Sequence, residues 1–454
     1  MRINIENATI INSGKEFKGA VSIEDDKIAC VQVDGESGSP LPPADQVIDA
    51  EGLYLIPGVI DDHVHVREPG LTQKADILSE SRAAAAGGVT SYMDMPNVLP
   101  QTTTPEAWAE KNRLAAARSV VNYAFFFGAT RNNIAYIEHL NPQEVCGVKL
   151  FMGSSTGGML VDGGHELEQI FRRSPILIMT HCEDSALISA AQARYRSLYG
   201  DDPEVKYHPM IRSEEACYRS TQTAVALAQQ TGARLHVAHV STARELELFD
   251  PAPLYDCNNR QHNKRITAEA CIAHLLFSQE DYARLGTRIK CNPAIKTAAD
   301  RQALREALST GGIDLIGTDH APHLLADKMG GCLRAASGMP MVQFSLPVML
   351  TLSDQHVLSR TRVVELMCHA PARLFDIADR GFIREGMQAD LVLLRPNTPH
   401  TVTDSDVLSK CGWTPLSGYT LNWRVEQTFC NGVPVYSRGK VLEEAHGQQL
   451  RFDR

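Results

Sequence analysis

The chain has 454 residues, a mass of 49.9 kDa and a formal net charge of −10 at pH 7. This acidic balance argues against general nucleic-acid binding, which requires a basic surface, and no apolar run approaches the roughly 18 residues of a membrane span. The 11 cysteines are odd in number and form no C-x-x-C pair, and the first residues contain no apolar signal core. We therefore expect a cytoplasmic protein with reduced thiols, without a disulfide scaffold or a structural zinc site.

Both ends of the chain have the pattern of short β-strands. Six segments alternate apolar and polar side chains, as half-buried strands do: residues 2–11, 20–23, 27–33, 390–394, 424–430 and 433–436. Turn residues such as Asn431-Gly432 separate them. The pattern predicts one small β-sandwich domain that is built from both termini, residues 1–55 and residues 381–454.

The middle of the chain, residues 56–380, alternates short apolar segments with longer amphipathic ones. The eight apolar segments are residues 58–66, 89–95, 121–128, 147–152, 176–181, 235–240, 265–271 and 313–319. Between them lie helix-like stretches such as residues 74–86, 105–118 and 213–230. Parallel strands that are buried on both faces form near-continuous apolar runs. Eight strand–helix units of this kind predict an α/β fold, a (β/α)8 TIM barrel.

Polar side chains stand where the predicted barrel strands end, which is where such barrels carry their chemistry. The candidate metal ligands are His63 and His65 on the first strand, Lys149 on the fourth, His181 on the fifth, His239 on the sixth and Asp319 on the eighth. His63 and His65 are two residues apart and therefore share a face of their strand. Imidazole and carboxylate ligands suit zinc. Most other histidines, His208 among them, are interpreted as surface or satisfied core residues.

Lys149 is unusual among metal ligands, because a buried ammonium beside divalent cations should be expelled or deprotonated. A neutral amine in that place could react with carbon dioxide, and the resulting carbamate has two oxygens that can bridge two metals. The alternative is an ion pair between Lys149 and a nearby carboxylate such as Asp162. Charge and position alone leave both alternatives open.

Three motifs resemble those of the dihydroorotases, which are cyclic amidohydrolases of the amidohydrolase superfamily. The motifs are PGVIDDHVHVREPG at residues 57–70, DMPN at residues 94–97 and TDHAPH at residues 318–323. The resemblance extends over nearly the whole chain, from Gly52 to about Val392. The related allantoinases and dihydropyrimidinases share the metal ligands, but we do not expect Arg67 and Asn97 there in these contexts.

The resemblance implies a pair of divalent metal ions, for which zinc is favoured by the histidine-rich ligands. It places one ion on His63, His65 and Asp319 and the other on His181 and His239, with carboxylated Lys149 as the bridge. Some dihydroorotases use an aspartate from a D-D-G turn instead, and the corresponding turn here has only Asp162.

The resemblance also implies the residues that hold the substrate. Arg67, Asn97 and His323 match residues that bind the substrate carboxylate, and Asn292 matches another substrate-side position. The expected partner is a small molecule, with no nucleic acid and no membrane, and a homo-oligomer is compatible with the sequence.

The implied reaction is the reversible hydrolysis of (S)-dihydroorotate to N-carbamoyl-L-aspartate, a step of de novo pyrimidine biosynthesis. Two metals about 3.5–4 Å apart can hold a bridging hydroxide as the nucleophile, and Asp319 would act as general base and then general acid. The alternatives are a dihydropyrimidinase, hydantoinase or allantoinase, and an inactive scaffold relative. A scaffold should have lost ligands, whereas all six ligand positions here carry suitable residues.

Residues 324–338 follow the Asp319 strand and contain Gly330-Gly331 and Gly338 but few large apolar side chains. Such a segment should bury little surface and have low local stability. Its place at the rim of the barrel predicts either a lid over the substrate or a passive surface loop.

Overall fold

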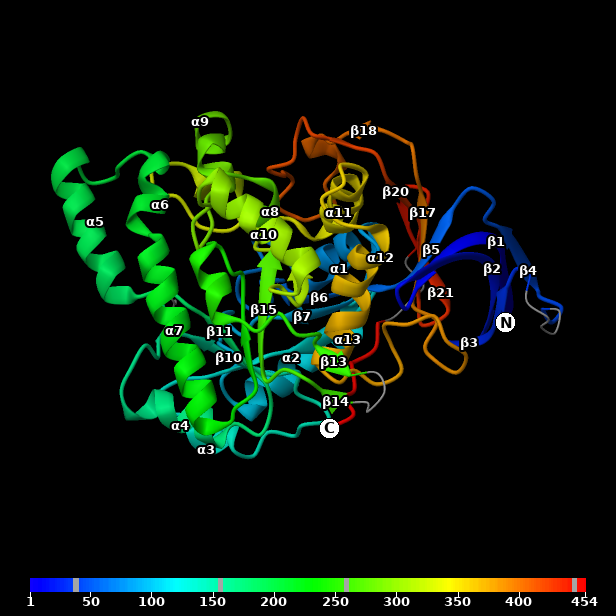
Figure 1. Ribbon diagram of the computed structural model, residues 1–454, viewed down its shortest axis with the longest axis horizontal. Helices are drawn as coiled ribbons and strands as arrows, with labels where there is room; N and C mark the ends of the chain where they lie inside the picture. Colours follow the sequence, from blue (N-terminus) through cyan, green and yellow to red (C-terminus); the bar gives the residue numbers. More distant parts are fainter. Residues whose placement is uncertain (36–40, 154–157, 257–260, 443–446) are drawn as a thin grey trace.

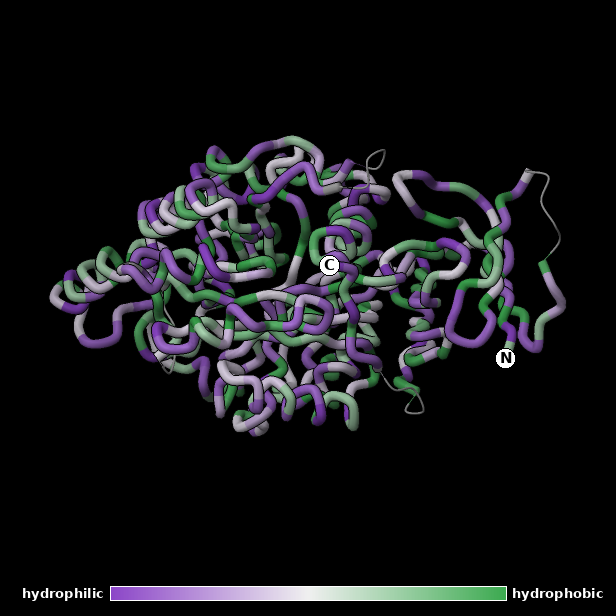
Figure 2. The backbone as a smooth tube through the Cα atoms, turned by 90° about the horizontal axis from the view of Figure 1, so that it is seen from below, coloured by the Kyte–Doolittle hydropathy of each residue, from purple (hydrophilic) through white to green (hydrophobic). Residues whose placement is uncertain are grey.

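The computed structural model describes residues 1–35, 41–153, 158–256, 261–442 and 447–454. Figure 1 shows a barrel surrounded by helices beside a curved β-sheet, with the N-terminus in the sheet and the C-terminus against the barrel. In the perpendicular view of Figure 2 the sheet forms a separate lobe at one end of the barrel. The predicted architecture, a (β/α)8 barrel with a smaller β domain, is confirmed.

Eight parallel strands form the barrel. They are β6 (Val59–Val64), β7 (Val89–Asp94), β8 (Asn122–Phe125) with its continuation β9 (Phe127–Gly128), β10 (Val148–Phe151), β11 (Ile178–His181), β12 (Leu235–Val237), β15 (Ile266–Cys271) and β16 (Leu315–Gly317). Pairing runs from β6 to β8 and from β9 to β16. The barrel closes where the backbone N–H of His65, after β6, donates to the carbonyl of His320, after β16, at 2.7 Å. All eight strands lie within the predicted segments.

The helices of the barrel begin and end at residues that favour these positions. Helix α10 (Ala298–Thr310) begins after a capping box of Thr297 and Asp300 and ends at Gly311, whose φ of 90° suits glycine. Its buried residues Leu304, Ala307 and Leu308 share one face, as a helix packed on a sheet requires. The other α-helices of at least five residues in the described parts of the chain are α1 (Ile77–Ala86), α2 (Pro105–Arg118), α4 (His165–Arg173), α5 (Ser185–Tyr199), α7 (Glu214–Thr231), α8 (Ile272–Leu276), α11 (Ser345–Asp354), α12 (Arg360–Val364) and α13 (Ala370–Leu374).

Nine strands from both ends of the chain form the second sheet. They are β1 (Arg2–Asn12), β2 (Lys15–Glu24), β3 (Lys27–Val33), β4 (Gln46–Asp49), β5 (Tyr54–Pro57), β17 (Leu391–Arg395), β20 (Arg424–Cys430), β21 (Val433–Ser437) and β22 (Lys440–Val441). Their order is β22-β21-β20-β17-β5-β1-β2-β3, and β4 pairs with β1. The antiparallel pairing of β5 with β17 joins the two ends of the chain. One apolar core, with residues from β1, β2, β5, β17 and β20, holds this sheet together.

Two parts of the predicted C-terminal β segment lie on the barrel instead. Trp413 is 1% exposed and donates its indole N–H to the carbonyl of His323 at 2.7 Å. Near the C-terminus, the N–H of Leu450 donates to the carbonyl of Tyr123 in β8 at 2.9 Å. Both segments bury large side chains on the barrel, which the alternation of strand residues does not reveal. The predicted domain limits at residues 55 and 380 stay a prediction.

Two expectations drawn from composition can be compared with the described residues. No helix in these parts of the chain is both long and apolar enough to cross a membrane. The ten cysteines among them are all free thiols, and Cys257 lies outside the described residues.

Candidate active site

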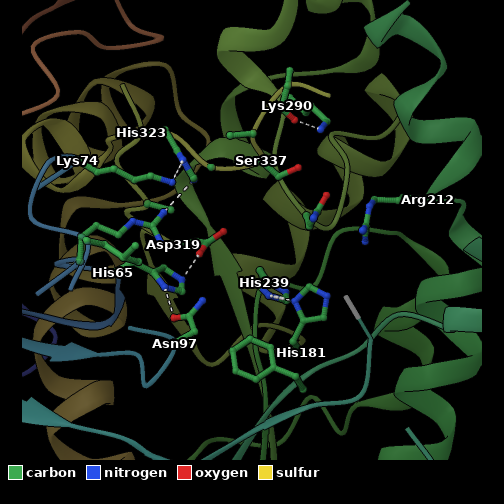
Figure 3. Close-up of a pocket in the computed structure, with 18 of the residues that line it drawn as sticks. His65, Lys74, Asn97, His181, Arg212, His239, Lys290, Asp319, His323 and Ser337 are labelled. Carbon is green, nitrogen blue, oxygen red and sulfur yellow. Dashed lines mark hydrogen bonds and ion pairs between the residues drawn. The ribbon is translucent and has the colours of Figure 1, made fainter. Parts of the chain in front are cut away.

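All ten predicted site residues line one cavity of about 670 Å³ at the C-terminal ends of the barrel strands. They are His63, His65, Arg67, Asn97, Lys149, His181, His239, Asn292, Asp319 and His323. Figure 3 shows His65 and Asp319 on one side of the cavity and His181 and His239 on the other, with their side chains pointing into it. The predicted convergence of strand ends is therefore present in the structure.

Three of these residues have left-handed backbone conformations that side chains other than glycine rarely adopt. The φ angles are 67° for Arg67, 38° for His239 and 47° for Asp319. Such residues cost about 1–3 kcal/mol each and persist only where surrounding contacts hold them. Here the N–H of His239 donates to Glu269 Oε1 at 2.9 Å, and Arg67 Nε donates to the carbonyl of Pro322 at 3.0 Å. The chain thus bears backbone strain where it turns side chains into the cavity.

The first group of candidate ligands consists of His63, His65 and Asp319, whose possible ligand atoms lie close together. His63 Nδ1 donates to Glu269 Oε1 at 3.0 Å, and His65 Nδ1 donates to Asn97 Oδ1 at 2.9 Å. In the neutral form that binds a metal, an imidazole that donates through Nδ1 in this way presents the lone pair of Nε2 to the ion. Asp319 Oδ1 lies 3.5 Å from His63 Nε2 and 3.1 Å from His65 Nε2. These side chains can present two imidazole nitrogens and a carboxylate oxygen to one ion, and this donor set fits a divalent metal ion.

The charge on Asp319 is consistent with this arrangement. Burial would raise the pKa of its carboxyl group, but His63 and His65 outweigh burial and lower that pKa below its ordinary value. The same holds for Glu269, where burial opposes and His63 favours ionisation, so that the pKa falls to about 2. Both carboxylates are thus ionised at neutral pH and can orient or bind a cation.

The second group consists of His181 and His239. His181 Nε2 donates to Glu183 Oε2 at 2.9 Å, which leaves a lone pair on Nδ1. His239 Nε2 lies 2.9 Å from that Nδ1, and His239 Nδ1 is buried with no hydrogen-bond partner among the described residues. Glu183 is in turn paired with Arg212 inside the protein. These two imidazoles fit a second ion.

Lys149 lines the same cavity from β10 and is 1% exposed. Its Nζ has no hydrogen-bond partner among the described residues, and burial lowers its pKa. The alternative ion pair with Asp162 is not formed. Asp162 is one-third exposed and binds Arg131 at 3.2 Å, and it does not line the cavity. A buried amine without a partner is the feature expected of a lysine that is modified when metal is present.

The predicted substrate-side residues occupy another wall. Arg67 is buried, and its Nη2 lies 3.1 Å from His323 Nε2. Asn292 Oδ1 accepts a hydrogen bond from His208 Nε2 at 3.1 Å. His208, expected to be an ordinary histidine, is buried and lines the cavity from the short helix α6 (His208–Ile211). The search for polar residues at strand ends missed His208, because this residue begins a helix and does not end a strand.

Several residues of the site carried no signal that the sequence reasoning used. Glu183 lies two residues after His181, and Glu269 is a carboxylate inside an apolar strand. Either feature could have indicated a buried partner for a histidine. Lys74 and Lys290 also line the cavity, but they come from a turn and a loop. No pattern in the sequence marks these two lysines.

The contacts of residues 324–338 argue against the expected low local stability, and the choice between a lid and a passive loop stays a prediction. Lys328 is 1% exposed, and its Nζ donates to the carbonyls of Ala336 and Gly338, both at 2.7 Å. Asp202 Oδ2 accepts from the N–H of Gly331 at 2.6 Å, and a Cβ on that glycine would lie 2.1 Å from the Pro203 carbonyl oxygen. The segment is thus anchored at several points and forms a wall of the cavity.

The sequence profile of the Amidohydrolase family matches residues 54–435, which is most of the chain. The chain belongs to this amidohydrolase family. Proteins of the family generally bind divalent metals, which agrees with the ligand groups of this amidohydrolase.

Curated relatives of this amidohydrolase have three different names at similar identity. It is 31% identical to an allantoinase of Bacillus velezensis over 96% of this chain and 94% of the relative. It is 32% identical to a dihydroorotase of Methanosarcina mazei over 97% of both chains. It is 30% identical to an L-hydantoinase of Paenarthrobacter aurescens over 98% of this chain and 96% of the relative. These are all cyclic amidohydrolases, and identity alone does not resolve the substrate.

Solved structures of cyclic amidohydrolases superimpose on the chain over nearly its whole length. The L-hydantoinase (dihydropyrimidinase) from Arthrobacter aurescens superimposes with a TM-score of 0.90 at 28% identity, over 99% of both chains. A dihydropyrimidinase from Brevibacillus agri gives 0.87 at 22% identity over the full length of both chains, which supports the fold alone.

Proposed function

We propose that this amidohydrolase is a dihydroorotase, which interconverts dihydroorotate and N-carbamoyl aspartate. The observation that carries the proposal is Arg67, a buried guanidinium that lines the same cavity as the metal-ligand groups. A buried arginine needs an anionic partner, and its planar fork matches a carboxylate. Dihydroorotate has a carboxylate, whereas the ring of dihydrouracil, hydantoin or allantoin has none.

The residues present fit two divalent ions, for which we favour zinc. His63, His65 and Asp319 would hold one ion, and His181 and His239 the other. The Lys149 amine would add carbon dioxide and lose a proton, and the resulting carbamate would help to hold both ions. Bound in this way, the ions would polarise the ring amide carbonyl and lower the pKa of the attacking water.

Asp319 would move the proton of the reaction. It is ionised and held beside His63 and His65, so it can accept a proton from the attacking water. The same proton would pass to the ring nitrogen when the amide C–N bond breaks. Ring opening creates a new carboxylate and releases a proton, so low pH favours ring closure, the direction that pyrimidine synthesis needs.

Four residues would fix the substrate relative to Asp319. Arg67 and His323 would bind the ring carboxylate from one wall. Asn97 and Asn292 would contribute amide groups from the others, since Asn97 Oδ1 is used by His65 and leaves its amide Nδ2 to donate. Such alignment can supply several kcal/mol of rate enhancement.

The test is a comparison of substrates with the metal-loaded enzyme. Dihydroorotate, dihydrouracil, hydantoin and allantoin are offered at equal concentrations, and kcat/KM is measured for wild type and for Arg67→Met. We expect dihydroorotate to be preferred and Arg67→Met to raise its KM strongly. Faster hydrolysis of an uncharged ring by wild type would assign the protein to the hydantoinases or allantoinases instead.

A further inference from the structure

Lys74 stands beside the proposed carboxylate site and has no assigned role. It lies in the turn before α1, where its N–H donates to the carbonyl of Leu71 at 2.9 Å, and its side chain lines the cavity. Figure 3 shows Lys74 and His323 pointing towards each other, and Lys74 Nζ is 3.1 Å from His323 Nδ1. His323 Nε2 faces Arg67 Nη2 at 3.1 Å, so one imidazole lies between two cations.

This arrangement leaves one donor without an acceptor. His323 is neutral, because burial and the charges of Arg67, Lys74 and Lys328 lower its pKa to about 2. A neutral imidazole has one lone pair and one N–H, so it can accept from only one of its two cationic neighbours. Lys74 also forms an ion pair with Asp327, but Asp327 Oδ2 is 3.8 Å from Nζ, which is too far for a hydrogen bond.

A carboxylate in the cavity can supply the additional acceptor. Arg67 contacts the carbonyl of Pro322 through Nε and the ring of His323 through Nη2. Its third nitrogen, Nη1, takes part in neither of these contacts. A carboxylate has about four acceptor sites and could therefore take Nη1 of Arg67 and a hydrogen of Lys74 together. Burial and the charge of Arg67 lower the pKa of Lys74, and Asp327 opposes them only in part, so a further anion at this wall would stabilise the ammonium.

We propose that Lys74 is a specificity-determining residue that binds the substrate carboxylate together with Arg67 and His323. The inference rests on the proposed function, since it requires a carboxylated ring. Lys74 thereby favours charged over uncharged cyclic amides. It contacts the carboxylate and not the reacting amide, so its loss should change binding more than turnover.

The test uses the metal-loaded enzyme and two ligands, of which only one has a free carboxylate. Orotate and its methyl ester are titrated by calorimetry into wild type, Lys74→Met, Lys74→Arg and the control Lys410→Met. Lys410 binds the same turn through the carbonyl of Thr72 at 2.6 Å and Asp76 at 2.9 Å, but it does not line the cavity. Loss of a charge-assisted contact should weaken orotate binding roughly 10-fold to 100-fold in Lys74→Met.

The expected pattern has three parts. The ester should lose less than about twofold in Lys74→Met, Lys74→Arg should restore most of the affinity for orotate, and KM for dihydroorotate should rise while kcat stays within about twofold. Equal weakening of both ligands, or a selective loss of orotate binding in Lys410→Met as well, would reduce Lys74 to a structural residue and overturn the inference. A wild type that neither binds orotate nor turns over dihydroorotate would instead overturn the proposed function, and the role of Lys74 with it.

Discussion

Glu269 should control metal affinity although it would not bind the proposed ions itself, because it is hydrogen-bonded to two of the candidate ligands. Its carboxylate is fully buried on β15 and accepts from His63 Nδ1 at 3.0 Å and from the N–H of His239 at 2.9 Å. It therefore orients one histidine of each ligand group and fixes the tautomer of His63. Glu269→Gln keeps the shape and one acceptor but removes the charge that strengthens both bonds.

The magnitude follows from these two contacts. Partners of metal-bound histidines typically contribute 10-fold to 100-fold in metal affinity, which is about 1.4–2.8 kcal/mol. We expect a loss of this size in Glu269→Gln, measured by competition with a chelator of known affinity. Because the contacts reach both ligand groups, the affinity of both ions should fall.

Glu245→Gln is the matched control. Glu245 is also a buried carboxylate, but it accepts from Thr221 at 2.8 Å and Thr242 at 2.9 Å and touches no candidate ligand. This variant should lose thermal stability with metal affinity within about twofold of wild type. Wild-type metal affinity in Glu269→Gln, or an equal loss in Glu245→Gln, would refute the role assigned to Glu269.

Three further outcomes are expected. Lys149→Ala should lose at least one metal per chain, with partial rescue by short carboxylic acids, and wild type labelled with carbon-13 bicarbonate should show a carbamate NMR signal; two metals and full activity in the variant would contradict the bridge. Lys328→Met should leave buried carbonyls without a donor and cost about 1–3 kcal/mol, seen as a lower Tm and faster hydrogen exchange at residues 330–338; unchanged exchange there would contradict the anchoring role of Lys328. His369 is buried and neutral, since burial lowers its pKa to about 4, while its unfolded pKa is about 6.5. Stability should therefore fall by up to about 3 kcal/mol as pH drops from 6.5 to 4, and His369→Gln should flatten the Tm profile there; an unchanged profile would contradict this assignment.

The sequence located the candidate ligands better than the residues that hold these side chains in place, for a physical reason. A buried parallel strand is recognised in the sequence as an apolar run, and a polar residue at its end lies at the rim of the barrel. His181 and Asp319 could therefore be placed from the residues around them alone. Glu269 is joined to His63 across 206 positions of the chain. Lys74 is joined to His323 across 249 positions, and no local pattern records such distant pairs.

Residues 324–338 show where composition misleads. Low apolar content predicts low stability if burial of side chains is the main source of stability. In this segment the backbone itself is held, because a buried ammonium of Lys328 and the carboxylate of Asp202 satisfy its carbonyl and N–H groups. Unsatisfied buried backbone groups are costly, so two charged side chains with several contacts each can replace many apolar ones. A wall fixed in this way keeps the cavity in shape without a hinge at Gly331, where a Cβ would collide with the backbone of Pro203.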